Sequence, residues 1–170
     1  FVYTFAKIIK ISDSDFINAI KSFVGLPHRY EIFLKKKNVI FINDSKATSF
    51  EATKFALSNS KNVYWILGGM PKKNDKIILP VSKKNIIKCC LIGKNTNFFQ
   101  KQIKNKINFS ITKNLKKTIL EILTDIRLSK KKNSTILLSP AAASYDQYKN
   151  FEKRGNEFKK LSKIYVRKFI

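Results

Sequence analysis

The sequence has little of the chemistry that would indicate a metal-binding, disulfide-bonded or membrane-spanning protein. Its two cysteines, Cys89 and Cys90, are adjacent within an apolar run, so they offer neither a disulfide framework nor a four-ligand metal site. We expect two buried thiols in a reducing compartment. The single histidine, His28, cannot form a metal site alone. Because no run of about 18 apolar residues occurs, we expect no membrane insertion.

Arginine is also scarce, although the chain is strongly basic. Only four of the 35 basic residues are arginine, and the formal net charge is +24. Such a charge ordinarily indicates nucleic acid or an anionic membrane as partner. Nucleic-acid recognition favours the bidentate arginine fork, however, and the lysines here are scattered through every segment among Asn, Ile and Phe. We interpret the lysine content as a bias towards A/T-rich codons and expect no specific nucleic acid. A basic, non-catalytic nucleic-acid-binding module is the alternative.

The chain is long enough for one compact domain with a core, having 170 residues of which 44% are hydrophobic. Residues 12–25 begin with cap-forming residues, continue with apolar positions at helical spacing and end in Gly25, which predicts an amphipathic helix. Residues 1–11 hold another apolar segment, too short for a core of its own. We therefore predict that residues 1–26 are the tail of a preceding domain and residues 27–170 a separate one. Since the chain begins with Phe rather than Met, we expect part of a longer protein.

Beyond Pro27 the pattern alternates between strands and helices. The segments that read as strands are 30–34, 39–42, 63–67, 88–92, 109–111 and 135–138. The segments with helical spacing are 50–59, 97–105, 114–129 and 149–164. This alternation predicts an α/β fold, a Rossmann-like and mostly parallel sheet with helices on both faces. The first strand, joined to the second by Lys35-Lys-Lys37, should pair antiparallel at an edge.

Three loops that follow strands are chemically unusual. They are Asn43-Asp-Ser-Lys-Ala-Thr48, Gly68-Gly-Met-Pro-Lys-Lys73 and Ser139-Pro-Ala-Ala-Ala-Ser-Tyr145. Because loops after parallel strands gather at one edge, where open α/β sheets bind ligands, we expect the three to meet there. Their lysines, hydroxyls and small residues indicate a pocket for a small polar molecule with more than one oxyanion. An amino acid with two carboxylates would fit.

Each feature also has a plainer interpretation. Thr48 and Glu51 have capping-box spacing, so Thr48 could simply begin the 50–59 helix. Gly68-Gly69 alone is only a turn signal, and Lys46 alone would be a solvated lysine. Phe151, by its spacing from later apolar residues, could belong to the helix core. The shared edge is what favours a binding site.

Four stretches resemble the Mur ligase family, most closely its D-glutamate-adding members. They are Gly-Leu-Pro-His-Arg at 25–29, Asn-Asp-Ser-Lys-Ala-Thr at 43–48, Tyr-Trp-Ile-Leu-Gly-Gly at 64–69 and the long, specific segment that runs from Leu138 through Ser-Pro-Ala-Ala-Ala-Ser-Tyr to Phe158. The resemblance covers about 25–165 and implies the C-terminal, amino-acid-binding domain of such a ligase. Residues 1–24 then resemble the last helices of the central, ATP-binding domain.

The resemblance implies ATP-dependent amide-bond formation through an acyl phosphate, in cytoplasmic peptidoglycan precursor synthesis and hence in cell-wall biogenesis and division. The partners would be D-glutamate, ATP with Mg²⁺ and UDP-N-acetylmuramoyl-L-alanine, and the ligase would be a monomer. Residues at D-glutamate-contacting positions are Lys46, Thr48, Lys72 or Lys73, Ser144, Tyr145 through its backbone, and Phe151. Residues at nucleotide-contacting positions are His28, Arg29 and Asp44. All of these residues position substrates, and none acts as a nucleophile.

The sequence also departs from the family pattern. Ala142 stands where many members have Cys, and Ser49 stands where many have Asn. Neither difference removes a charged ligand. The P-loop G-x-x-x-x-G-K-[ST] is missing: in its nearest approach, at Gly93-Lys94, Lys88 occupies the first Gly position and Asn95 the Ser/Thr position. We therefore expect the isolated chain not to complete the reaction. A related ligase that adds another amino acid is a further alternative.

Overall fold

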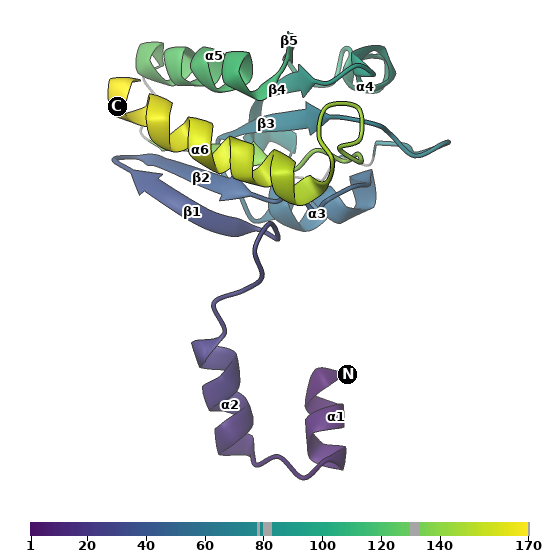
Figure 1. The fold of residues 1–170 in the computed structure, drawn as a ribbon, viewed down its shortest axis with the longest axis vertical. Coiled ribbons are helices and arrows are strands. Elements are labelled where there is room, and N and C mark those ends of the chain that lie inside the picture. The colour runs from purple at the N-terminus through teal and green to yellow at the C-terminus, as the bar shows by residue number, and fades with distance from the viewer. Residues whose placement is uncertain (78, 80–82, 130–132, 170) are drawn as a thin grey trace.

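A computed structural model describes residues 1–77, 79, 83–129 and 133–169, and its centre is a six-stranded sheet (Figure 1). The strands are β1 (Glu31–Lys36), β2 (Val39–Asn43), β3 (Val63–Gly68), β4 (Ile86–Ile92), β5 (Phe109–Lys113) and β6 (Ser134–Leu138). Each predicted strand is present, and its ends lie within two residues of the prediction. The order across the sheet is β1-β2-β6-β3-β4-β5.

Only the edge pair β1 and β2 is antiparallel, as predicted, and the other neighbouring strands run parallel. The short connection between β1 and β2 contains Lys37 with φ 47°, in the left-handed region that tight hairpins use. The last strand, β6, lies between β2 and β3. All five of its residues are buried, which explains its continuous apolar and small-residue pattern.

Helices cover both faces of the sheet. They are α3 (Phe50–Ser58), α4 (Thr96–Ile103), α5 (Leu115–Leu128) and α6 (Phe151–Phe169), with a short 3₁₀ turn, η1, at Lys83–Asn85. Alternate residues of β3 face opposite sides: Trp65 packs with buried residues of α3 and α4, and Ile66 with buried residues of α5 and α6. The adjacent cysteines divide in the same way, with Cys89 in the first cluster and Cys90 in the second. The α/β prediction is therefore confirmed.

The C-terminal helix extends beyond the prediction, from residue 164 to Phe169. Val166 in this extra turn is buried, and Tyr165 and Phe169 are partly buried against the same core cluster. Lysines and arginines interrupt these apolar positions in the sequence and conceal them. The added turn lengthens the contact of α6 with the sheet and with α5.

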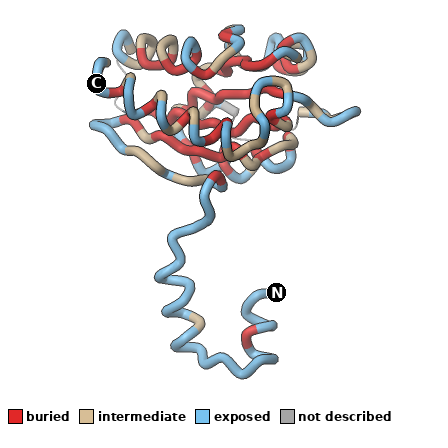
Figure 2. The backbone as a smooth tube through the Cα atoms, viewed as in Figure 1, coloured by how far each residue is buried: buried red, intermediate tan, exposed pale blue. Residues whose placement is uncertain are grey.

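Two N-terminal helices, α1 (Val2–Ile8) and α2 (Asp13–Ser22), extend away from the sheet (Figure 1). Ser12 caps α2 by accepting a hydrogen bond from the Asp15 backbone N–H at 3.1 Å. No residue of α2 is buried, and the whole segment is exposed except for the buried Ala6 and the partly buried Phe16 (Figure 2). Its large exposed apolar side chains include Phe1, Phe5, Ile8, Ile17, Ile20 and Phe23. Among the described helices, none has both the length and the apolar character needed to cross a membrane.

Candidate functional site

The three unusual loops follow three neighbouring strands, β2, β6 and β3. The Asp44 backbone N–H donates to the Leu138 carbonyl at 2.8 Å, and the Gly68 N–H donates to the Pro140 carbonyl at 2.9 Å. Met70 and Ala143 form a small bridge with reciprocal hydrogen bonds of 2.8 and 3.0 Å. The predicted gathering at one edge is therefore present, and main-chain hydrogen bonds join the loops to one another.

Lys46 and Phe151 meet at this edge. The Lys46 Nζ lies 4.0 Å from the centroid of the Phe151 ring, and the Lys46 N–H donates to the His28 carbonyl at 3.1 Å. The His28 ring packs edge-on against the same phenyl ring, with centroids 5.8 Å apart. Phe151 is thus a partly buried ring at the first turn of α6 with a cation above it, while Phe158 further along the helix is the one that fills the core.

Ser144 and Tyr145 occupy the loop that leads into α6. Ser144 is buried, and its carbonyl accepts from the N–H groups of Gln147 and Tyr148 at 3.0 and 2.8 Å, which turns the chain. Tyr145 is 68% exposed.

Thr48 is partly buried in the loop before α3, and it is not the N-cap of that helix. Ser49 is the cap, and its side chain accepts from the Ala52 N–H at 3.4 Å. Asp75 also contributes, because its carboxylate accepts from the Phe50 N–H at 3.2 Å. The capping-box interpretation of Thr48 is therefore wrong, since the neighbouring hydroxyl caps the helix.

The structure does not bring Lys72 or Lys73 into an ion pair with any described residue, and both are exposed. The Lys72 carbonyl accepts from the Asp75 N–H at 3.2 Å. That hydrogen bond turns the chain within this loop, and the Asp75 carboxylate joins the loop to the start of α3. This arrangement leaves both ammonium groups in solvent beside the edge.

Asp44 is buried, and both of its carboxylate oxygens have partners. The Tyr30 N–H donates to Oδ1 at 3.1 Å, and the Ser139 hydroxyl donates to Oδ2 at 2.7 Å. Burial raises the pKa of Asp44, and the Ser139 and Tyr30 hydrogen bonds and the charge of Arg29 oppose that rise. Arg29 itself is exposed.

His28 belongs to a polar cluster that the sequence did not indicate. Asn43 Nδ2 donates to both His28 Nδ1 and Glu31 Oε2 at 2.9 Å, so Nδ1 is the accepting nitrogen and the ring is neutral. The His28 N–H and the Lys159 ammonium also donate to Glu31, at 3.0 and 2.8 Å. Burial and the charge of Lys159 lower the pKa of His28, against the opposing charges of nearby carboxylates.

Arg154 is a further residue that sequence reasoning missed. It is 1% exposed and donates from Nε to the Ser45 hydroxyl at 3.0 Å and from Nη2 to the Ser45 and Ala142 carbonyls at 2.8 and 3.0 Å. Burial lowers the pKa of Arg154 to about 10, and the nearby charge of Asp146 opposes that shift. One signal was available: this rare arginine stands three residues after Phe151 and four before Phe158, on the buried side of α6.

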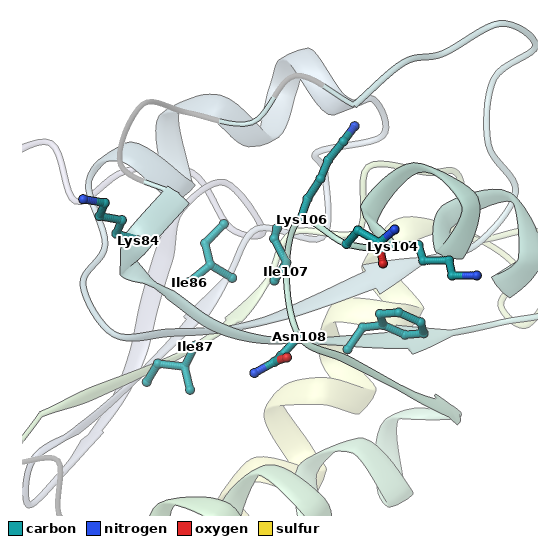
Figure 3. Close-up of a pocket in the computed structure, with 9 residues that line it drawn as sticks. Lys84, Ile86, Ile87, Lys104, Lys106, Ile107 and Asn108 are labelled. Carbon is teal, nitrogen blue, oxygen red and sulfur yellow. The ribbon is translucent and has the colours of Figure 1, made fainter.

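A separate hollow lies at the opposite edge of the sheet, by the amino ends of β4 and β5 (Figure 3). Lys84, Lys104 and Lys106 surround the apolar side chains of Ile86 and Ile107 there. Among the described residues, the lining contains no serine, threonine or carboxylate that would orient an amino acid. Among the described residues, no group of three or more His, Cys, Asp or Glu side chains could hold a metal ion.

Comparison with known proteins identifies relatives over most of the chain. It is 42% identical over 152 residues to the UDP-N-acetylmuramoylalanine--D-glutamate ligase of a Wolbachia from Brugia malayi, covering 89% of this chain and 30% of that protein. The ligases of that name from Rhizobium meliloti and Rickettsia felis are 39% and 38% identical, covering 88% and 95% of this chain and 32% and 36% of theirs.

Two other comparisons were made. No family model matches the chain. Among solved structures, a murein peptide ligase from Psychrobacter arcticus aligns with a TM-score of 0.48 and 10% identity, over 85% of this chain and 32% of that one. The chain spans about a third of the length of the curated relatives that it matches. It is a homologue of the C-terminal portion of ligases named UDP-N-acetylmuramoylalanine--D-glutamate ligase.

Proposed function

We propose that this chain is the amino-acid-binding part of an ATP-dependent ligase that adds D-glutamate to UDP-N-acetylmuramoyl-L-alanine. The observation that carries the proposal is the junction of loops at the carboxyl ends of β2, β6 and β3, with Lys46 poised over Phe151. Such an edge is where open α/β sheets bind ligands. The similarity to ligases named for this reaction supports the choice of substrate.

In this proposal the loops hold D-glutamate by both of its carboxylates. Lys46 and Lys72 neutralise the carboxylates, while the hydroxyls of Thr48 and Ser144 and the backbone at Tyr145 form directional hydrogen bonds. The Phe151 ring holds the Lys46 ammonium in place by a cation–π contact. The amine of the amino acid is then oriented towards an activated acyl group, and it attacks that carbon with loss of phosphate. The contribution of these residues is orientation and charge neutralisation.

The division of the chain is also part of the proposal. Residues 1–26 are the end of a central, ATP-binding domain, and residues 27–170 form the amino-acid-binding domain. The large apolar side chains of α1 and α2 support this division, because so many exposed ones in so short a segment indicate a surface that other polypeptide covers. Of the nucleotide-contacting positions, His28 and Arg29 follow residues 1–26 directly, and Asp44 lies beside them with its carboxylate accepting from the Tyr30 N–H.

ATP phosphates and Mg²⁺ would be held by the part of the ligase that precedes this chain. The sequence has no P-loop, and the described residues offer no cluster of carboxylates suited to a metal ion. Of the nucleotide-contacting positions, the exposed Arg29 is free to reach a phosphate or ribose, while His28 and Asp44 shape the loop behind it. We propose that the assembled ligase works in the cytoplasm as a monomer.

A chimera tests this proposal. The first two thirds of the Wolbachia ligase, joined to this chain, should release phosphate only when D-glutamate, ATP and the nucleotide-sugar substrate are all present. Lys46→Ala and Thr48→Ala should each raise the KM for D-glutamate at least about tenfold, the loss of roughly one charge-assisted hydrogen bond. Lys54→Ala is the control, because Lys54 pairs on the surface with Glu51. A chimera that is active but insensitive to both site substitutions would refute the site.

A further inference from the structure

Arg154 is an unusual residue for a structural position. It is one of the largest fully buried side chains, yet within the described residues it makes no ion pair with a carboxylate. Its Nη1 is buried without a hydrogen-bond partner among those residues. Burying a cation without a counter-ion costs stability, and a packed apolar side chain would ordinarily be more favourable. The arginine is therefore better explained by what it organises than by the stability that it adds.

Arg154 lies where the three loops that follow β2, β6 and β3 meet. Nε and Nη2 bind the hydroxyl and carbonyl of Ser45, in the loop after β2, and Nη2 also binds the carbonyl of Ala142, in the loop after β6. The third loop lies beside the guanidinium as well, because a Cβ added to Gly69 would lie 3.1 Å from Nη1. One planar group thus spans loops that are about a hundred residues apart along the chain.

The contacts continue from Arg154 into the proposed ligand residues. The Ser45 hydroxyl, which accepts from Arg154, itself donates to the Phe151 carbonyl at 2.8 Å. Ser45 directly precedes Lys46, whose ammonium lies over the Phe151 ring. Ala142 lies two residues before Ser144. A displacement of the Arg154 guanidinium would therefore change the position of Lys46 relative to Ser144.

We propose that Arg154 is a positioning residue that sets the spacing between Lys46 and Ser144 by holding the loop after β2 against the loop after β6. This role rests on the proposed function, because the two residues it spaces are the ones assigned to D-glutamate. Arginine is required because its rigid fork places one donor, Nε, at the Ser45 hydroxyl and another, Nη2, at the Ser45 and Ala142 carbonyls, whereas the single ammonium of lysine cannot occupy both positions. The guanidinium charge, which forms no ion pair among the described residues, also favours an anionic ligand nearby.

The test is a titration of the isotope-labelled 170-residue chain with D-glutamate, followed through backbone amide resonances. Arg154→Lys keeps the charge and loses the fork, and it should weaken D-glutamate binding about tenfold or more. Ser45→Ala removes only the hydroxyl that accepts from Arg154 and donates to the Phe151 carbonyl. It should weaken D-glutamate binding by a smaller factor. Arg167→Lys, on the exposed side of the same helix, is the matched control and should leave binding unchanged.

A double variant that carries both Arg154→Lys and Ser45→Ala distinguishes a positioning role from a general loss of stability. Because both substitutions break the same Arg154–Ser45 contact, the double variant should bind scarcely more weakly than Arg154→Lys alone. Unchanged binding in Arg154→Lys, or losses that simply add, would overturn the proposal. If Arg154→Lys does not fold, unchanged binding in Ser45→Ala overturns it and weaker binding supports it. If the unsubstituted chain fails to bind D-glutamate, the proposed function itself fails and this inference fails with it.

Discussion

The ammonium of Lys46 lies 4.0 Å from the centre of the Phe151 ring, which joins the loop after β2 to the first turn of α6. The ring offers its electron-rich face to the cation, a contact worth about 0.5–1 kcal/mol at a partly exposed site. It holds a flexible side chain in place before any ligand arrives. The pair is therefore a direct target for measurement.

Replacing Phe151 by leucine should weaken D-glutamate use without unfolding the domain. Leucine keeps the apolar contact and removes the ring face, so the KM for D-glutamate in the chimeric ligase should rise about two- to fivefold. Phe55→Leu serves as the control, since Phe55 is an exposed aromatic residue on α3. Equal effects of the two substitutions would argue against a special role for the Lys46–Phe151 pair.

The lysines after the Gly-Gly turn can be distinguished by single substitutions. If Lys72 neutralises a carboxylate of D-glutamate, Lys72→Ala should raise the KM for D-glutamate about tenfold, while Lys73→Ala should change it little. The KM for ATP should remain the same in both variants, which distinguishes amino-acid binding from nucleotide binding. The opposite order of effects would assign the ligand role to Lys73.

Glu31 should matter for stability more than an exposed carboxylate does. It accepts hydrogen bonds from the His28 N–H, Asn43 Nδ2 and Lys159 Nζ, so Glu31→Gln should lower the free energy of unfolding by about 1–3 kcal/mol. Glu51→Gln breaks an exposed pair with Lys54 and should cost less than about 1 kcal/mol. Urea unfolding of both variants measures the difference. Similar losses would show that the buried cluster adds no stability of its own.

His28 should make stability depend on pH between neutral and mildly acidic conditions. Because its pKa is lowered in the folded state, the unfolded chain takes up a proton first as the pH falls through about 6.5. Stability is therefore lost as the pH falls from 7 towards the folded-state pKa. His28→Gln should flatten this part of the profile in urea unfolding at pH 7.0 and 5.5. An unchanged slope would mean that another group titrates there.

Gly69 should resist substitution far more than Gly25. At Gly69, with φ 136°, an added Cβ would lie 2.3 Å from the Ala143 carbonyl oxygen and would break the bridge between the two loops. Gly25→Ala meets nothing within 4 Å and carries only the strain of its φ of 83°, about 1 kcal/mol. Thermal unfolding should show the larger fall in Tm for Gly69→Ala. Comparable falls would indicate that the two loops are not tightly joined.

The fold class followed from the sequence because its cause is local. Continuous apolar strands such as 63–67, alternating with helices of 3.6-residue period, can bury both faces of a sheet in only a few ways. The hairpin between β1 and β2 was equally predictable from the shortness of the connection between the two strands. The helix end at Phe169 was missed, because lysines between the apolar positions hide a turn that only packing against the core stabilises.

The sequence by itself determined the six strands, the helices between them and the three polar loops at one edge. Tertiary structure decided which loops are neighbours, because insertion of β6 between β2 and β3 is fixed by long-range packing that no local pattern encodes. It also decided that Ser49 caps α3 in place of Thr48, and that Arg154 is buried against Ser45 and Ala142. A basic residue in a lysine-rich chain reads as solvated until the fold surrounds it with carbonyl groups.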